Sequence, residues 1–87
     1  MMQTRFVQEV RAIPLWLLRE YLAELGGQTQ SDDILHGKEW TARLTQIEDY
    51  QIGSLRVGQV RMEITGEADA VAQVQTLLTP KLLRAGG

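Results

Sequence analysis

The sequence contains no cysteine, a single histidine and only two prolines. Without cysteine the chain cannot form disulfides, thiolate metal sites or iron–sulfur clusters, and it has no thiol nucleophile. This composition fits a reducing compartment. His36 has no second histidine or cysteine with which to complete a zinc site or a catalytic triad, so we interpret it as a turn residue. The sequence therefore predicts no catalytic residue, no metal and no cofactor.

The chain also lacks a charge excess and a long apolar run. Nine basic and eleven acidic residues give a net charge of −2, which provides no field to attract a phosphate backbone. The longest apolar run, residues 13–18, contains Pro14 and is far shorter than a membrane span, and the N-terminus lacks the apolar stretch of a signal peptide. We expect no nucleic-acid partner, no membrane association and a cytoplasmic location.

What the sequence does contain is the ordinary composition of a folded protein, with 44% apolar and 23% charged residues. At 87 residues, we expect a single α+β domain spanning residues 1–87. In its middle, apolar residues alternate with polar ones, a pattern typical of antiparallel strands with one buried face. These apolar residues are Trp40, Ala42, Leu44, Val60, Met62 and Ile64.

Further strands are predicted at residues 4–12 and at the short apolar pair Ile34–Leu35. The alternation of the two central strands shifts by one residue near Gln46, where we predict a β-bulge, and again at Gly58, where we predict a bulge or a bend. Residues 49–54 are the expected hairpin between these two strands.

In two segments the apolar residues recur at helical spacing, so each predicted helix has an apolar stripe that must pack against another element. The first helix is expected over residues 14–26, because Pro14 suits a first turn and Gly26 is a natural stop. The second begins near Ala68 and is expected to be kinked or split at Pro80, since proline in a helix interior costs about 3 kcal/mol. The predicted fold is a single antiparallel β-sheet with two helices on one face, in the order β-α-β-β-β-α with room for one more strand.

Three arginines, Arg43, Arg56 and Arg61, should lie on or near the solvent face of the sheet. They could bind an anion or an acidic partner, although a wet face with cross-strand Arg–Glu pairs is the favoured interpretation. Trp16 lies off the leucine stripe of the first helix. It could be the rim of the core or the anchor of an interface, including that of a homodimer.

The chain ends in Gly86-Gly87. Ubiquitin-like sulfur carriers expose such a tail, which is activated at its carboxylate, but there it leaves the last strand of a β-grasp sheet. Here it follows a predicted helix, after which glycine is also an ordinary stop. We therefore favour a cap over a carrier tail.

Four stretches carry a resemblance to a known family. They are residues 13–18, 39–42, 52–58 and 81–87. With them the chain resembles a small uncharacterised bacterial family, similar to the domain appended to the C-terminus of a sulfur-carrier protein related to the small subunit of molybdopterin synthase. The resemblance implies a TATA-binding-protein-like, helix-grip architecture and specifies no catalytic residues.

We therefore expect a non-enzymatic accessory or protein-interaction module linked to sulfur-carrier or molybdenum-cofactor metabolism. Its expected partner is a sulfur-carrier or molybdopterin-synthesis protein. Two alternatives stay open: a sulfur carrier activated at Gly87, and a small-ligand binder with a pocket between helix and sheet.

Overall fold

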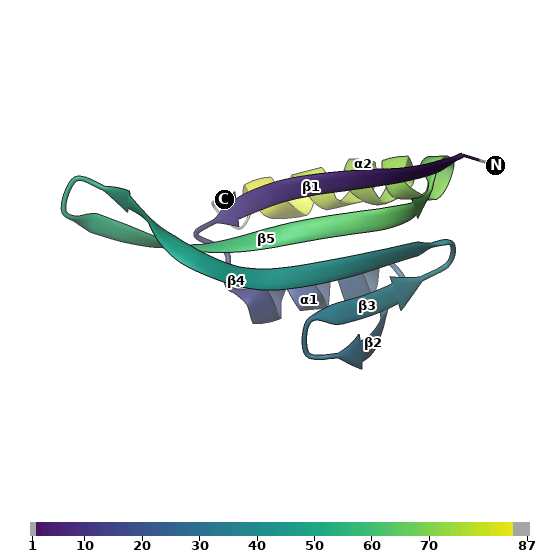
Figure 1. Ribbon diagram of the computed structural model, residues 1–87, viewed down its shortest axis with the longest axis horizontal. Coiled ribbons are helices and arrows are strands. Elements are labelled where there is room, and N and C mark those ends of the chain that lie inside the picture. The colour runs from purple at the N-terminus through teal and green to yellow at the C-terminus, as the bar shows by residue number, and fades with distance from the viewer. Residues whose placement is uncertain (1, 85–87) are drawn as a thin grey trace.

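The computed structural model describes residues 2–84 and contains one five-stranded antiparallel sheet and two helices (Figure 1). The elements in chain order are β1 (Gln3–Arg11), α1 (Leu15–Glu24), β2 (Gln28–Ser31), β3 (Ile34–Gly37), β4 (Trp40–Ile52), β5 (Leu55–Glu67) and α2 (Ala68–Arg84). The strands lie side by side in the order β1-β5-β4-β3-β2. The α+β class and the antiparallel sheet are confirmed, and the additional strand is β2.

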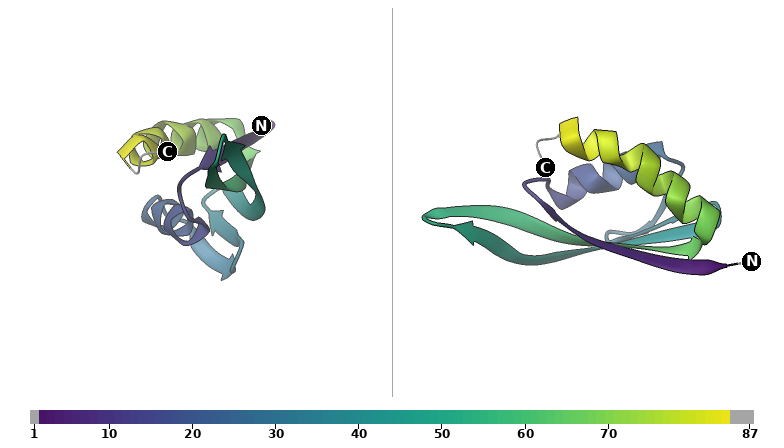
Figure 2. Two further views of the ribbon diagram at one scale, coloured as in Figure 1. Left: turned by 90° about the vertical axis from the view of Figure 1, so that its left-hand side faces the viewer. Right: turned by 90° about the horizontal axis from the view of Figure 1, so that it is seen from above.

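Both helices cover the same face of the sheet, as the view from above in Figure 2 shows. Helix α1 packs on β3 and β4, whereas α2 packs on β1 and β5. The apolar residues of the central alternation all point into this layer and form the core with buried residues of both helices, as predicted. The core residues are Val10, Ile13, Leu18, Leu22, Leu35, Trp40, Ala42, Leu44, Val60, Met62, Ile64, Val71, Val74, Leu78 and Leu82.

Helix α1 begins directly after Pro14 and ends at two glycines, close to the predicted limits. Gly26 adopts φ +103°, a left-handed conformation that glycine accepts without steric cost. The N–H groups of Gly26 and Gly27 donate to the carbonyls of Ala23 and Leu22, at 3.0 Å each. This is the Schellman arrangement, which satisfies carbonyls that the helix end would otherwise leave free.

Helix α2 continues through Pro80, so the predicted split is wrong. The helix persists because Leu78 and Leu82, on either side of the proline, are both buried against the sheet. The Thr79 hydroxyl donates to the Gln75 carbonyl at 2.8 Å, a local bond within the same turns. A kink at Pro80 stays a prediction.

The irregularities predicted near Gln46 and at Gly58 are one structure, a β-bulge. Ile47 pairs with Gln59 and Tyr50 pairs with Val57, so two residues of β4 lie opposite the single residue Gly58 of β5. This is the two-against-one count of a β-bulge, which increases the local twist of the ribbon. This one bulge accounts for both breaks in the apolar–polar alternation of the sequence. Beyond it, β4 and β5 continue into residues 49–54, which were predicted to be the hairpin connection.

Candidate functional site

Beyond the bulge, β4 and β5 form a hairpin that projects past the helices (Figures 1 and 2). Its neighbours stop earlier, since β1 pairs with β5 only as far as Gln59 and β3 pairs with β4 only as far as Arg43. We call residues 48–58 the arm. Among residues 2–84, no strand pairs with either outer edge of the arm, and at its base the Gly58 carbonyl accepts a hydrogen bond from the Ala12 N–H at 2.9 Å. The molecule measures 46 × 22 × 20 Å, and the arm forms one end of its long axis.

A hydrogen-bonded side-chain network fixes the base of the arm. The buried Gln59 donates from Nε2 to the Glu48 carbonyl at 3.0 Å and accepts from Arg11 Nε at 3.1 Å. Gln46 Nε2 donates to the Gln59 carbonyl at 2.8 Å. The Arg11 guanidinium carbon lies 3.6 Å from the centroid of the Tyr50 ring, a cation–π contact. These contacts tie the arm to β1 and set its direction.

The tip of the arm exposes apolar side chains. Ile52 and Leu55 pair across the two strands and are 55% and 67% exposed. Gly53, with φ +58°, starts the two-residue connection between them, a conformation that hairpins of this length require. An exposed apolar pair on a ribbon with open backbone edges is the kind of surface that binds another protein. The sequence interpretation missed this surface. The alternation of the apolar Leu55 and Val57 with Arg56 was a usable signal that the strand extends this far.

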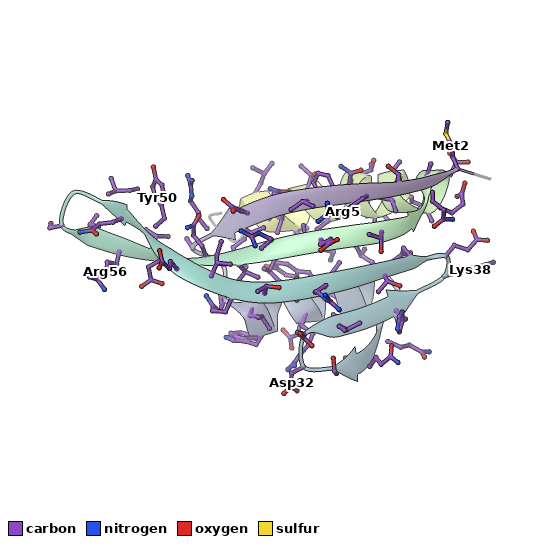
Figure 3. All side chains as sticks on the ribbon, viewed as in Figure 1. Met2, Arg5, Asp32, Lys38, Tyr50 and Arg56 are labelled. Atoms are coloured by element: carbon purple, nitrogen blue, oxygen red, sulfur yellow. The ribbon has the colours of Figure 1, made fainter. Side chains whose placement is uncertain are left out.

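Two of the three predicted arginines, Arg43 and Arg61, share one face of the sheet near Glu63, and Arg56 lies apart from them. Arg43 lies opposite Glu63 on the wet face of the sheet, and Arg61 lies on the same face and pairs with Glu9 at 3.3 Å. Arg56 lies on the arm, opposite Gln51 (Figure 3). It precedes Arg61 by five positions along β5, which corresponds to roughly 16 Å. An anion site at these residues stays a prediction, and the cross-strand Arg–Glu interpretation accounts for the contacts of Arg61.

Glu63 is the centre of charge on this wet face. Arg5 Nε donates to its carboxylate at 2.5 Å. This hydrogen bond is the main cause that lowers the pKa of Glu63. Partial loss of solvent around the carboxylate opposes it, and the positive charges of Arg5, Arg43 and Arg61 each lower the pKa further. The Glu63 carboxylate thus contacts Arg5 directly and feels the positive charges of Arg43 and Arg61 on the neighbouring strand positions.

The remaining candidates lie elsewhere. Trp16 is 57% exposed on α1, and its role as a contact stays a prediction. His36 lies in β3 rather than in a turn, with Nδ1 2.9 Å from the Thr41 hydroxyl on β4, because β3 extends to Gly37. Residues 2–84 hold no cluster of acidic, histidine or cysteine side chains that could bind a metal ion. No helix in that range has the length and apolar character needed to cross a membrane.

A hollow of about 520 Å³ lies between α2 and the end of the sheet. It is a candidate for the pocket that the small-ligand alternative requires. Leu25, Glu39, Trp40, Gln73 and Leu77 are among its lining residues, so polar and apolar groups are mixed. A small-ligand role for it stays a prediction. Gly86-Gly87, for which we favoured a cap over a carrier tail, lies outside the described residues.

Comparison with known proteins adds an identification at the level of family. Among curated proteins, none matches the chain. A family model described as archaeal MoaD-like protein matches residues 7–87. This match confirms the resemblance to sulfur-carrier-related proteins, although its description names archaea where the resemblance pointed to bacteria. The chain belongs to the archaeal MoaD-like protein family.

Proposed function

We propose that this chain is a non-enzymatic interaction module of cytoplasmic molybdopterin or sulfur-carrier metabolism, and that it binds a partner protein through the arm. Membership of the MoaD-like family supports the metabolic setting. The observation that carries the binding role is the exposed pair Ile52 and Leu55 on a projecting hairpin whose base is fixed by Gln59.

The composition of the arm suits a protein partner. Behind its apolar tip the arm carries the exposed charged side chains of Glu48, Asp49 and Arg56, so that apolar and polar surfaces adjoin as they do in protein interfaces. Its open backbone edges can also accept an added strand, a common mode of peptide recognition. A base held by hydrogen bonds reduces the ordering cost of association.

The test is binding of the purified chain to the separately purified sulfur-carrier and molybdopterin-synthesis proteins of the same organism, measured by calorimetry. We expect the double variant Ile52→Ser/Leu55→Ser to weaken binding at least about tenfold, as loss of a buried anchor pair does. Leu77→Ser on α2, also exposed at 46%, is the control and should bind like the wild type. Unchanged affinity of the tip variant, or no binding of the wild type to any of these proteins, would contradict the proposal.

The family match also supports the alternative that the chain is itself a sulfur carrier activated at Gly87. The helix α2, which reaches Arg84, favours the interaction module, since carrier tails leave a strand. Incubation with ATP and the carrier-activating enzyme of the host, followed by intact-mass measurement, separates the two. We expect no change in mass, and a Gly87 adenylate or thiocarboxylate would establish the carrier.

A further inference from the structure

The outer edge of β1 has no neighbouring strand in the part of the chain that the structure describes. Within residues 2–84, β1 pairs only with β5. The Ala12 N–H donates to the Gly58 carbonyl at 2.9 Å, and the Ala68 N–H donates to the Met2 carbonyl at 2.8 Å. Both bonds continue the β1–β5 register, so the even-numbered residues of β1 direct their backbone groups toward β5. The odd-numbered residues therefore direct theirs outward, where a further strand could pair with them.

The strand that fits this edge is a second copy of β1. We propose that two copies of the chain associate through antiparallel β1–β1 pairing about a two-fold axis at Val7, which joins two sheets into one. In this register each outward-facing residue meets an outward-facing residue, as ladder hydrogen bonds require. The exposed Val7 side chains, 42% exposed in one copy, then meet each other at the axis.

The charges on the edge select this register. With the axis at Val7, Arg5 of each copy lies directly opposite Glu9 of the other, which makes two favourable cross-strand pairs. An axis at Arg5 or at Glu9 would place two like charges face to face. Within one copy Arg5 already contacts Glu63 and Glu9 contacts Arg61. The proposed pairing extends these contacts into a continuous row of alternating sign across both sheets.

The helix-facing side of β1 leaves room for the second copy. Thr4 and Gln8 are exposed and Phe6 is only partly buried, so α2 does not cover the outer part of this strand. A hollow of about 250 Å³ opens there, lined by Val10, Leu82 and Leu83 among others.

The end of the neighbouring β1 would lie against this hollow. Met2 precedes β1 at its N-terminal end (Figure 3) and is 76% exposed, and Leu83 beside the hollow is 70% exposed. In the proposed register, Met2 of the second copy lies opposite Ala12, next to the hollow. Two exposed apolar side chains would thus be covered by the same association.

Charge reversal tests the register. In sedimentation at low salt over a concentration series, Arg5→Glu and Glu9→Arg alone should each raise the dimer dissociation constant roughly ten- to thirtyfold, since each turns two attractive pairs into repulsive ones. An equimolar mixture of the two variants should associate like the wild type, because the reversed side chain at position 5 of one copy then faces the reversed side chain at position 9 of the other. Arg43→Glu, on the same face but far from the edge, is the control.

A backbone variant tests the edge itself. Because the Val7 N–H points outward, Val7→Pro removes a donor from the interface without breaking a β1–β5 bond, and it should make the chain monomeric, whereas Val7→Thr should not. Circular dichroism confirms that each variant is folded. A wild type that stays monomeric up to about 1 mM, a dimer that survives Val7→Pro, or a charge-reversed mixture that fails to associate would each overturn the proposal.

Discussion

At the scale of single residues, Trp40 determines how the end of the sheet is built. Its side chain is buried against two glycines that leave space for the indole ring, Gly27 and Gly37. A Cβ at Gly37 would lie 1.9 Å from Trp40 Cε2, and a Cβ at Gly27 would lie 2.9 Å from Trp40 Cη2. The preceding residue, Glu39, adopts φ +66°, which a non-glycine residue rarely does. The burial of one large side chain thus fixes the identity of neighbouring residues.

Gly37→Ala should therefore lower the free energy of unfolding by about 1–3 kcal/mol, the usual cost of overpacking a core site. Gly58→Ala is the matched control: a Cβ there meets nothing within 4 Å, so its effect should stay within about 0.5 kcal/mol. Urea denaturation of both variants measures this. Equal midpoints for the two variants would show that the indole ring can move aside.

Glu63, on the solvent-exposed face of the sheet, makes the free energy of unfolding depend on pH. Its pKa is lowered in the folded protein, chiefly by the hydrogen bond from Arg5, so the folded state binds a proton there less readily than the unfolded chain does. The stabilisation is present above the ordinary glutamate pKa and is lost as the pH falls through the lowered value. In thermal melts between neutral pH and about pH 3, we expect the difference between wild type and Glu63→Gln to shrink toward acid pH. A constant difference would mean that Glu63 contributes no pH dependence.

At the scale of elements, the arm is the part of the sheet that stands without helix support. An isolated two-stranded ribbon is marginally stable in water, so its order depends on the contacts at its base. Gln59 makes two of those contacts, one to Glu48 in β4 and one to Arg11 in β1.

Gln59→Ala should loosen the arm without unfolding the body. We expect faster amide hydrogen exchange in residues 50–57 and little change in α1 and α2, because the helices pack on the other half of the sheet. Gln51→Ala serves as the control, because the Gln51 side chain donates to the Gly53 carbonyl within the tip and makes no bond to β1 among the described residues. Uniform acceleration over the whole chain would instead show that the arm and the body unfold as one unit.

At the scale of the whole molecule, the exposed apolar side chains lie on several separate surfaces. Ile52 and Leu55 lie on the arm, Val7 lies on the β1 edge, and Trp16 lies on α1. This separation allows the chain to contact a partner protein and a second copy at once.

Trp16→Ser should change the free energy of unfolding by no more than about 0.5 kcal/mol, since the side chain is 57% exposed. If Trp16 anchors a contact, the same variant should weaken binding to the partner or lower the mass seen by light scattering. Lost stability with unchanged mass and binding would place Trp16 in the rim of the core instead.

The sequence by itself determined the class of the fold and the inward face of the sheet. The signals are local: apolar residues alternate at Leu44 and Met62 and recur at helical spacing at Leu18 and Leu22. These side chains are buried in the structure because each strand or helix packs its apolar side against the core. Pro14 and Gly26 likewise marked the limits of α1 through their backbone preferences.

Only the tertiary structure decided the rest. Gln28–Ser31 is entirely polar and exposed, and it is a strand because β3 offers it hydrogen bonds. The arm was predicted only as a connection between strands, because its tip buries no side chain and the alternation at Leu55 and Val57 has no burial pattern beside it. The positions of Arg43, Arg56 and Arg61 relative to one another depend on strand register and on one bulge, and these are set by pairing across the sheet rather than by any residue alone.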